Sequence, residues 1–275
     1  MNVYGTEQIR NVVLLGHGGA GKTTVAEAMA LITGVTKRMG KVADGNTISD
    51  YDKEEIKRQF SISTTLIPLE YQGENGPVKI NLLDTPGFFD FVGEVEEAIS
   101  VADAAIIVVN CKAGIEPGTE RAWEMCEKYN LPRLIFVTNM DDDHASYREL
   151  VVKLEKKFGR KIAPFQLPIR ENEKFVGYIN VMKMAGRRFT GIGTREECEI
   201  PEYSKANLDI YREAMMDAVA ETSEEFMERY FAGDEFSVGE IRAAMKTNVN
   251  DGSIIPVSMG SSMELRNIHN LMNDI

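Results

Sequence analysis

The chain has 275 residues, of which 43% are hydrophobic and 27% charged, so it can bury a sizeable core. Its 31 basic and 43 acidic residues give a formal net charge of -12, which argues against a direct grip on nucleic acid by charge alone. Three widely spaced cysteines argue against a structural zinc site and indicate reduced thiols in a cytoplasmic protein. No apolar run approaches the ~20 residues of a membrane span, so we expect no membrane contact.

A glycine-rich segment, GHGGAGKT at positions 16–23, lies between an apolar run at 11–15 and a helix-like segment at 24–30. A strand, a glycine-rich loop and a helix in this order form a phosphate cradle, in which backbone N–H groups and the helix N-terminus face the phosphates. Lys22 would reach the β- and γ-phosphates, and the Thr23 hydroxyl can bind Mg²⁺. The predicted phosphate-binding residues are Gly18, Gly19, Ala20, Gly21, Lys22, Thr23 and Thr24. The alternative, a plain glycine turn, does not explain the flanking strand and helix.

A second motif, Asp84-Thr85-Pro86-Gly87, follows a predicted hairpin with strands at 60–69 and 78–83. A carboxylate at the carboxyl end of a strand, on the same edge of the sheet as the phosphate loop, can hold Mg²⁺ through water. The Gly87 N–H would then sense a γ-phosphate. The alternative is a simple β-turn, which the motif alone would also fit.

The remaining pattern alternates helices and strands. Helices are predicted at 94–102, 117–129 and 147–158, and buried strands at 104–110 and 133–137. Such alternation predicts a doubly wound, mostly parallel α/β sheet with ligands at the carboxyl ends of its strands. Further on, the pattern predicts strands at 164–169, 175–184, 189–193 and 254–259, and helices at 207–231, 237–245 and 265–272.

These segments together resemble the translational GTPases, and most closely the nucleotide-binding domain of elongation factor G. Besides the two motifs, the resemblance rests on segments 94–96, 136–137 and 220–225, and on Pro256-Val257 before Gly260-Ser261-Ser262. It implies a P-loop NTPase fold with a GTP-binding domain at 1–165 and 250–275, and an inserted α+β subdomain at 166–249. It also implies GTP or GDP and Mg²⁺ as ligands, the ribosome as partner of the full-length protein, and a monomeric fragment of a larger multidomain protein.

The resemblance assigns roles residue by residue. Magnesium roles pass to Thr23, Ser61 and Asp84, the γ-phosphate roles to Lys22 and Gly87, and base-reading roles to Asn139, Asp141, Ser261 and Ser262. Ser61 stands where the family has a threonine within Arg-Gly-Ile-Thr-Ile, and serine keeps the hydroxyl. Gly19 replaces an aspartate that is common in the family's phosphate loop.

The base-reading loop departs from the family's Asn-Lys-Met-Asp, because this chain has Thr138-Asn139-Met140-Asp141. Asp141 can accept hydrogen bonds from guanine N1 and the exocyclic amine, which adenine does not offer in that way. Thr138 lacks the amide that ties the base to the phosphate loop in the family. A shift of one residue, from Asn139 to Asp142, would restore an N-x-x-D pattern, but the preceding Phe136-Val137 disfavours it.

Phe88 occupies the catalytic position where the family has a histidine that orients the attacking water. Phenylalanine cannot position water, so intrinsic hydrolysis is expected to be low, as in a divergent group of elongation-factor-G-like proteins that lack this histidine. The resemblance implies a GTPase that forms GDP and phosphate in a ribosome-linked step. Alternatives are a nucleotide-dependent binding switch with little hydrolysis, a ribosomal protection-type factor, or a P-loop ATPase or kinase, in which Asp141 would have no task.

Overall fold

The computed structural model describes residues 3–74, 76–159 and 161–275. Within these residues the larger sheet has seven strands in the order β2-β3-β1-β4-β5-β11-β6. The strands are Ile9–Leu15 (β1), Thr65–Gly73 (β2), Gly76–Asp84 (β3), Ala104–Asn110 (β4), Arg133–Thr138 (β5), Ile162–Pro164 (β6) and Ile255–Met259 (β11). Only the pairing of β2 with β3 is antiparallel, so β3, β1, β4, β5 and β11 bring their carboxyl ends to one edge.

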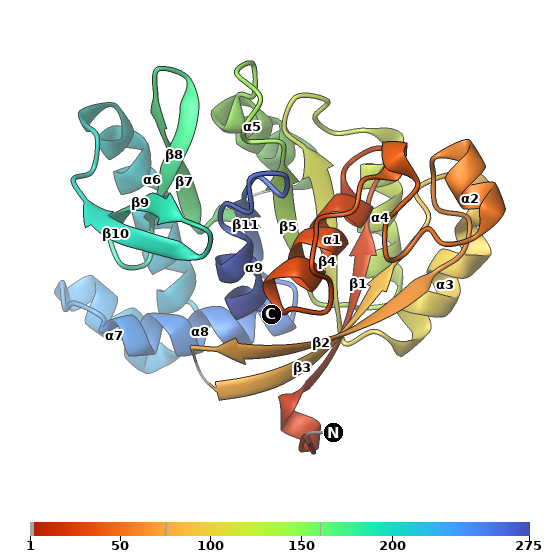
Figure 1. The fold of residues 1–275 in the computed structure, drawn as a ribbon. Helices are drawn as coiled ribbons and strands as arrows, with labels where there is room; N and C mark the ends of the chain where they lie inside the picture. Colours follow the sequence, from red (N-terminus) through yellow and green to blue (C-terminus); the bar gives the residue numbers. More distant parts are fainter. Residues whose placement is uncertain (1–2, 75, 160) are drawn as a thin grey trace.

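Helices cover both faces of this sheet (Figure 1). One face packs against α1 (Lys22–Ile32) and α9 (Ile268–Asp274), the other against α3 (Val92–Val101), α4 (Pro117–Lys128) and α5 (Tyr147–Phe158). Strand β1 contributes to both cores, since Val12 and Leu14 pack with α1 while Val13 and Leu15 pack with α3 and α4. Alternate residues of a strand point to opposite faces, so an uninterrupted apolar run is buried on both sides.

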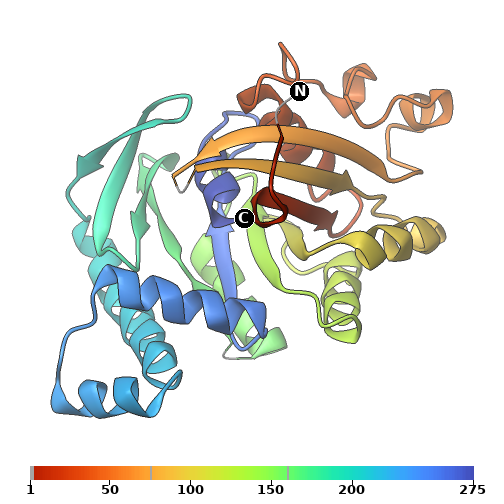
Figure 2. The same cartoon turned by 90° about the horizontal axis from the view of Figure 1, so that it is seen from below.

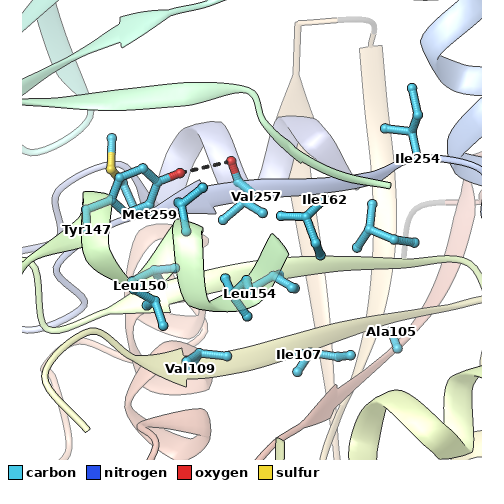
Figure 3. Packing of buried hydrophobic residues seen from close by; sticks show 14 of the residues in the cluster. Ala105, Ile107, Val109, Tyr147, Leu150, Leu154, Ile162, Ile254, Val257 and Met259 are labelled. Carbon is cyan, nitrogen blue, oxygen red and sulfur yellow. Dashed lines mark hydrogen bonds between the residues drawn. The ribbon is translucent and has the colours of Figure 1, made fainter. Parts of the chain in front are cut away.

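The core between α5 and the sheet is shown close up in Figure 3. Leu150 and Leu154 project from α5 toward the strands, where Ile107 and Val257 are fully buried. The buried Tyr147 hydroxyl donates a hydrogen bond to the Val257 carbonyl over 3.5 Å, which gives this polar atom a partner inside the core. This packing fixes β11, whose end leads into the Ser261-Ser262 loop.

A second, antiparallel sheet lies beside the first, in the order β10-β9-β8-β7 (Figure 2). Its strands are Gln166–Glu171 (β7), Lys174–Asn180 (β8), Ala185–Gly191 (β9) and Thr194–Cys198 (β10), and the helices that follow are α6 (Glu202–Ala220), α7 (Glu224–Ala232) and α8 (Val238–Asn250). The chain passes from one sheet to the other at Phe165, between β6 and β7. Apolar side chains of the second sheet, including Leu167 and Phe175, belong to the same core cluster as α4 and α5.

Three predicted elements are divided differently in the structure. The expected strand at 60–69 begins only at Thr65, because the N–H groups of residues 62–64 are bound by carboxylates of Glu55 and Glu94 instead of a neighbouring strand. The expected strand at 164–169 is two strands in different sheets.

The expected helix at 207–231 is likewise two helices, α6 and α7. The Ser223 hydroxyl accepts a hydrogen bond from Phe226 N over 3.1 Å and caps α7 at its start. Among the α-helices and strands of the described residues, α2 (Lys53–Arg58) and β10 had no counterpart in the prediction. Among the helices of the described residues, none is both long enough and apolar enough to cross a membrane.

Candidate functional site

The glycine-rich loop joins the end of β1 to the start of α1 and takes a conformation that needs glycine at several positions. Gly16, Gly19 and Gly21 have φ angles of 142°, 84° and 101°, in the left-handed region that side chains disfavour. A Cβ on Gly16 would also lie 2.4 Å from the Val108 carbonyl oxygen of β4. The loop is therefore folded against the sheet edge with its backbone close to the neighbouring strand.

Lys22 is the first residue of α1, and its side chain turns back across the loop. Its Nζ donates hydrogen bonds to the carbonyl oxygens of Gly16 and His17, each over 3.0 Å. Burial lowers the pKa of Lys22 to about 8, while the nearby carboxylates of Asp84 and Asp50 act in the opposite direction. At pH 7 the ammonium therefore keeps most of its positive charge, in a site from which water is largely excluded.

The segment after β3 lies directly against this loop. A Cβ on Gly87 would lie 2.5 Å from Lys22 Nζ and 2.6 Å from Gly18 N. Only glycine fits such an approach, which places the Gly87 backbone beside both groups that would face a phosphate. Thr85 supports this arrangement, since its buried hydroxyl donates to the Leu14 carbonyl of β1 over 2.5 Å.

The three predicted metal ligands, Thr23, Ser61 and Asp84, meet at the start of α1. The Thr23 hydroxyl donates to Asp84 Oδ2 over 2.8 Å, and Ser61 Oγ lies 3.4 Å from Thr23 Oγ1. Burial raises the pKa of Asp84 to about 6, against the opposing influence of Ser49, Thr23 and Lys22. Three hard oxygen donors from three separate segments thus share one small region.

Two functional candidates beside this cluster were missed in the sequence. Ser49 and Asp50 are 1% and 4% exposed, and within the described structure Ser49 Oγ, Asp84 Oδ1 and both carboxylate oxygens of Asp50 lack a partner in hydrogen-bonding geometry. Burial raises the pKa of Asp50, while the Ser61 hydroxyl acts to lower it. In the sequence, Ser49 and Asp50 form an isolated serine-aspartate pair in a stretch with no apolar period. Such a pair is only a weak indication of a functional site.

These unpaired oxygens provide a test of whether Mg²⁺ would fit. Mg²⁺ takes oxygen ligands and keeps several of its waters, which need acceptors in turn. The hydroxyls of Thr23 and Ser61, the Asp84 carboxylate and the unpaired oxygens of Asp50 supply both kinds of group. The residues present at the start of α1 therefore fit a magnesium ion.

The segment that carries Ser61 is held in place by buried carboxylates. Glu27 of α1 accepts hydrogen bonds from Gly40 N over 2.7 Å and from Ile48 N. Glu55 Oε1 accepts from Ile62 N over 2.9 Å and from Ser63 N over 3.1 Å. The backbone on both sides of Asp50 and Ser61 is therefore fixed by side chains that the sequence pattern did not identify.

The base-reading loop follows β5. Thr138 is buried, and its hydroxyl donates to the Ala20 carbonyl over 2.8 Å, so a tie to the phosphate loop is kept although the family's asparagine amide is absent. Asn139, with φ of 58°, and Asp141 expose their side chains, whereas Met140 between them is buried. The Asp142 carboxylate accepts a hydrogen bond from His144 N over 2.9 Å and pairs with Lys112 Nζ over 3.2 Å. Its oxygens therefore already have partners within the protein.

The fourth loop follows β11 and lies against the third. Met140 N donates to the Gly260 carbonyl over 3.3 Å, which joins the two loops. Ser261 is fully buried and exchanges backbone hydrogen bonds with Arg266 over 3.1 and 2.9 Å. Ser262 is also buried, and its hydroxyl has no partner within the described structure. The four predicted loops therefore lie at one edge of the sheet.

Phe88 lies over the phosphate loop. Its ring centroid is 4.7 Å from that of Phe60, and a Cβ on Gly18 would lie 3.2 Å from the tip of the Phe88 ring. The side chain nevertheless remains 43% exposed. Phe88 thus bridges the segment before Ser61 and the segment after Asp84, and a side chain at position 18 would press against its ring.

Comparison with known proteins agrees with this geometry. A family model described as the elongation factor Tu GTP binding domain matches residues 7–275. The chain belongs to this family. This GTP-binding domain is 36% identical over 272 residues to a protein named Elongation factor G from Neorickettsia sennetsu. The match covers 98% of this chain and 39% of that protein.

A solved structure from Thermus thermophilus shows the same fold for this GTP-binding domain. It matches with a TM-score of 0.89 at 35% sequence identity and covers 98% of this chain and 40% of that chain. The P-loop fold with an inserted subdomain is therefore confirmed. This GTP-binding domain spans about two fifths of the length of the relatives that it matches.

Proposed function

We propose that this domain binds GTP and GDP with Mg²⁺, and that the full-length protein hydrolyses GTP to GDP and phosphate in a ribosome-linked step of protein synthesis. The observation that carries the proposal is the convergence of Thr23, Ser61 and Asp84 beside Lys22 and Gly87. A P-loop alone would fit many nucleotide enzymes. Hydroxyls and a carboxylate from three segments at that loop fit a nucleoside triphosphate whose γ-phosphate orders the chain around it.

The chemical roles follow from the positions of the side chains. Lys22 would offer a buried positive charge to the phosphates, and the Gly87 N–H would donate to a γ-phosphate oxygen, which the close approach of Gly87 to Lys22 and Gly18 supports. Thr23, Ser61 and Asp84 would hold Mg²⁺, which when bound neutralises charge on the β- and γ-phosphates. The backbone N–H groups of residues 18–24 would bind the remaining phosphate oxygens.

Guanine selection is proposed for the loops after β5 and β11. Asp141 projects an exposed carboxylate beside Asn139, whereas Asp142 already accepts hydrogen bonds from His144 N and from Lys112 Nζ. Asp141 is therefore the better acceptor for guanine N1 and its amine, and Ser261 and Ser262 would bind the base from the other loop. The alternative N-x-x-D reading from Asn139 to Asp142 is disfavoured for the same reason.

A second candidate function is a nucleotide-dependent binding switch with slow hydrolysis. It is favoured by one observation, the contact of Phe88 with Phe60 and Gly18 at the place where a water-orienting histidine would stand. A phenylalanine ring there neither accepts nor donates a proton, so it cannot orient the attacking water. GTP would then act by ordering residues 38–64, with the ribosome or another factor as the partner that reads the ordered state.

Two measurements test these functions. Equilibrium binding of GDP and ADP should show a preference for GDP, and Lys22→Met should weaken the binding of GDP, whereas a preference for ADP would overturn the base assignment. Single-turnover GTP hydrolysis with and without ribosomes then separates the two candidates. Stimulation by ribosomes supports the GTPase, and slow turnover without stimulation supports the switch.

Further proposals concern organisation and surroundings. We infer a GTP-binding domain at 1–165 and 250–275 with an inserted subdomain at 166–249, supported by the change of sheet at Phe165. We also propose a cytoplasmic, monomeric protein whose ribosome contact is made without a direct nucleic-acid grip by this acidic domain, which has a net charge of -12.

A further inference from the structure

An arginine of the second sheet reaches the base-reading loop. Arg170 lies in β7, and its Nη2 donates to the Met140 carbonyl over 2.8 Å. Its Nη1 lies 3.5 Å from the Asp142 carbonyl and 2.5 Å from that of Glu173. The guanidinium is half-buried, so these contacts face less competition from water than surface ones do.

The backbone around Arg170 is arranged to aim this side chain. The pairing of β7 with β8 changes register between Ile169 and Arg170, and such irregularities bend a strand and redirect its side chains. The Tyr203 hydroxyl then fixes the residue, because it accepts a hydrogen bond from Arg170 N over 3.0 Å and donates one to Arg170 O over 3.1 Å. The backbone of Arg170 is thus fixed within the inserted subdomain, while its guanidinium binds the base-reading loop of the larger sheet.

The carbonyl that Arg170 binds belongs to the peptide that joins Met140 to Asp141. The N–H of Met140 is held by Gly260, its side chain is fully buried, and Asn139 before it has a φ of 58°. With both sides of Met140 fixed, the direction in which Asp141 leaves the backbone is fixed as well. We propose that Arg170 is a positioning residue through which the inserted subdomain sets the Asp141 carboxylate for guanine, an inference that rests on the proposed function.

A second arginine makes the reverse connection. Arg266, which closes the Ser261 loop through its backbone, donates from its guanidinium to the Phe175 carbonyl of β8. Both loops assigned to the base are therefore attached to the same antiparallel sheet, one by an arginine from the sheet and one by an arginine from the loop. The inserted sheet serves as a support for the base-binding side of the site.

The test compares GDP with inosine 5′-diphosphate, which lacks the exocyclic amine of guanine. In the full-length protein, Arg170→Gln should lower the ratio of GDP affinity to inosine-diphosphate affinity by about three- to tenfold, the range expected when one hydrogen bond to the guanine amine is weakened. Arg170→Lys keeps a donor and should lie closer to the unaltered protein. If Arg170 had only a structural role, the substitution would weaken the binding of both nucleotides equally and leave the affinity ratio unchanged.

The matched control is Arg188→Gln, an arginine of the same sheet that pairs with Glu171 instead of a base loop, and its ratio should not change. Tyr203→Phe removes the hydroxyl that fixes Arg170 and should lower the affinity ratio to a smaller extent. This variant replaces Arg170→Gln in the test if Arg170→Gln does not fold. An unchanged ratio in Arg170→Gln, or in Tyr203→Phe in that case, overturns the proposal. Failure of the unaltered protein to bind GDP overturns the proposed function, and this inference with it.

Discussion

Phe88 is the residue at which this chain departs most from the chemistry that its fold supports. Its ring fills the space above Gly18 and contacts Phe60, so two loop segments meet through apolar surface. An aromatic pair of this kind contributes about 0.5–1.5 kcal/mol beyond its burial. A phenylalanine side chain has no polar atom with which to orient a water molecule at this position.

The first prediction replaces this ring with an imidazole. Phe88→His in the full-length protein should not lower the rate of GTP hydrolysis. We expect the rate to rise, by up to about 10²-fold, because a positioned acid–base group contributes at least that much. Single-turnover hydrolysis in the presence of ribosomes measures it. Phe89→His, a substitution at the equally exposed neighbour, is the control and should have little effect. A large loss of rate in Phe88→His would reveal an active role for the phenylalanine.

The second prediction concerns the close approach of Gly87. Gly87→Ala should weaken GTP binding by about 1–3 kcal/mol, because its methyl group would overlap Lys22 Nζ and Gly18 N. Titration with a slowly hydrolysed GTP analogue measures the loss. Gly93→Ala in α3 is the matched control, since a Cβ there meets no neighbour within 4 Å. Equal affinities of the two variants would contradict the placement of Gly87 at the phosphates.

At the scale of elements, the segment between α1 and β2 has few backbone partners of its own. Carboxylates from α1, α2 and α3 bind its N–H groups, through Glu27, Glu55 and Glu94 respectively. Such a segment is held by a few side-chain contacts instead of a sheet ladder, and segments of this kind open at low free-energy cost. This arrangement suits a region that is ordered in one nucleotide state and released in another.

The third prediction removes one of these carboxylates. Glu55→Gln should destabilise the local structure of residues 53–64 by about 1–3 kcal/mol, because the backbone N–H groups of residues 52, 62 and 63 lose a charged acceptor. Limited proteolysis and amide hydrogen exchange of this segment report the change. Glu54→Gln is the control, since Glu54 is exposed and only pairs with its helix neighbours. If residues 53–64 are equally protected from proteolysis and hydrogen exchange in both variants, Glu55 does not hold the segment.

At the scale of the whole molecule, the two sheets do not have separate cores. Side chains of β7 and β8 pack in the same apolar cluster as α4, α5 and β11, and two arginines join the second sheet to the base-binding loops. Elements that share a core tend to unfold together. We therefore expect the larger sheet and the inserted subdomain to behave as one cooperative unit.

The fourth prediction tests this unit. Phe175→Ala, in the second sheet, should destabilise the 275-residue chain by about 3–5 kcal/mol, because Phe175 is only 1% exposed. Urea unfolding followed by the fluorescence of Trp123, the single tryptophan, and by circular dichroism should give coincident, equally shifted transitions. Phe231→Ala is the control, since that ring is 80% exposed. Separate transitions for the two probes would show that the parts unfold independently.

Much of the doubly wound sheet was predictable because its signals are local. The buried strand at 104–110 and the helix at 147–158 have the predicted bounds, since an apolar run and a helical period depend only on neighbouring residues. The strands at 60–69 and 164–169 were misjudged because their patterns are apolar in sequence, while side-chain carboxylates and a change of sheet decide their ends. The long helix at 207–231 was misjudged because one serine cap outweighs helical periodicity.

The phosphate loop, the family and the residue types that can serve as magnesium and guanine ligands were predictable before folding is considered, because they depend on short motifs with fixed spacing. Only the folded structure shows that Asp50 is buried where its charge acts on Asp84, that Thr138 binds the phosphate loop, and that Arg170 binds the Met140 carbonyl. Those contacts join residues far apart in the chain, or depend on burial. Burial and long-range approach arise only when the sheets and loops have come together.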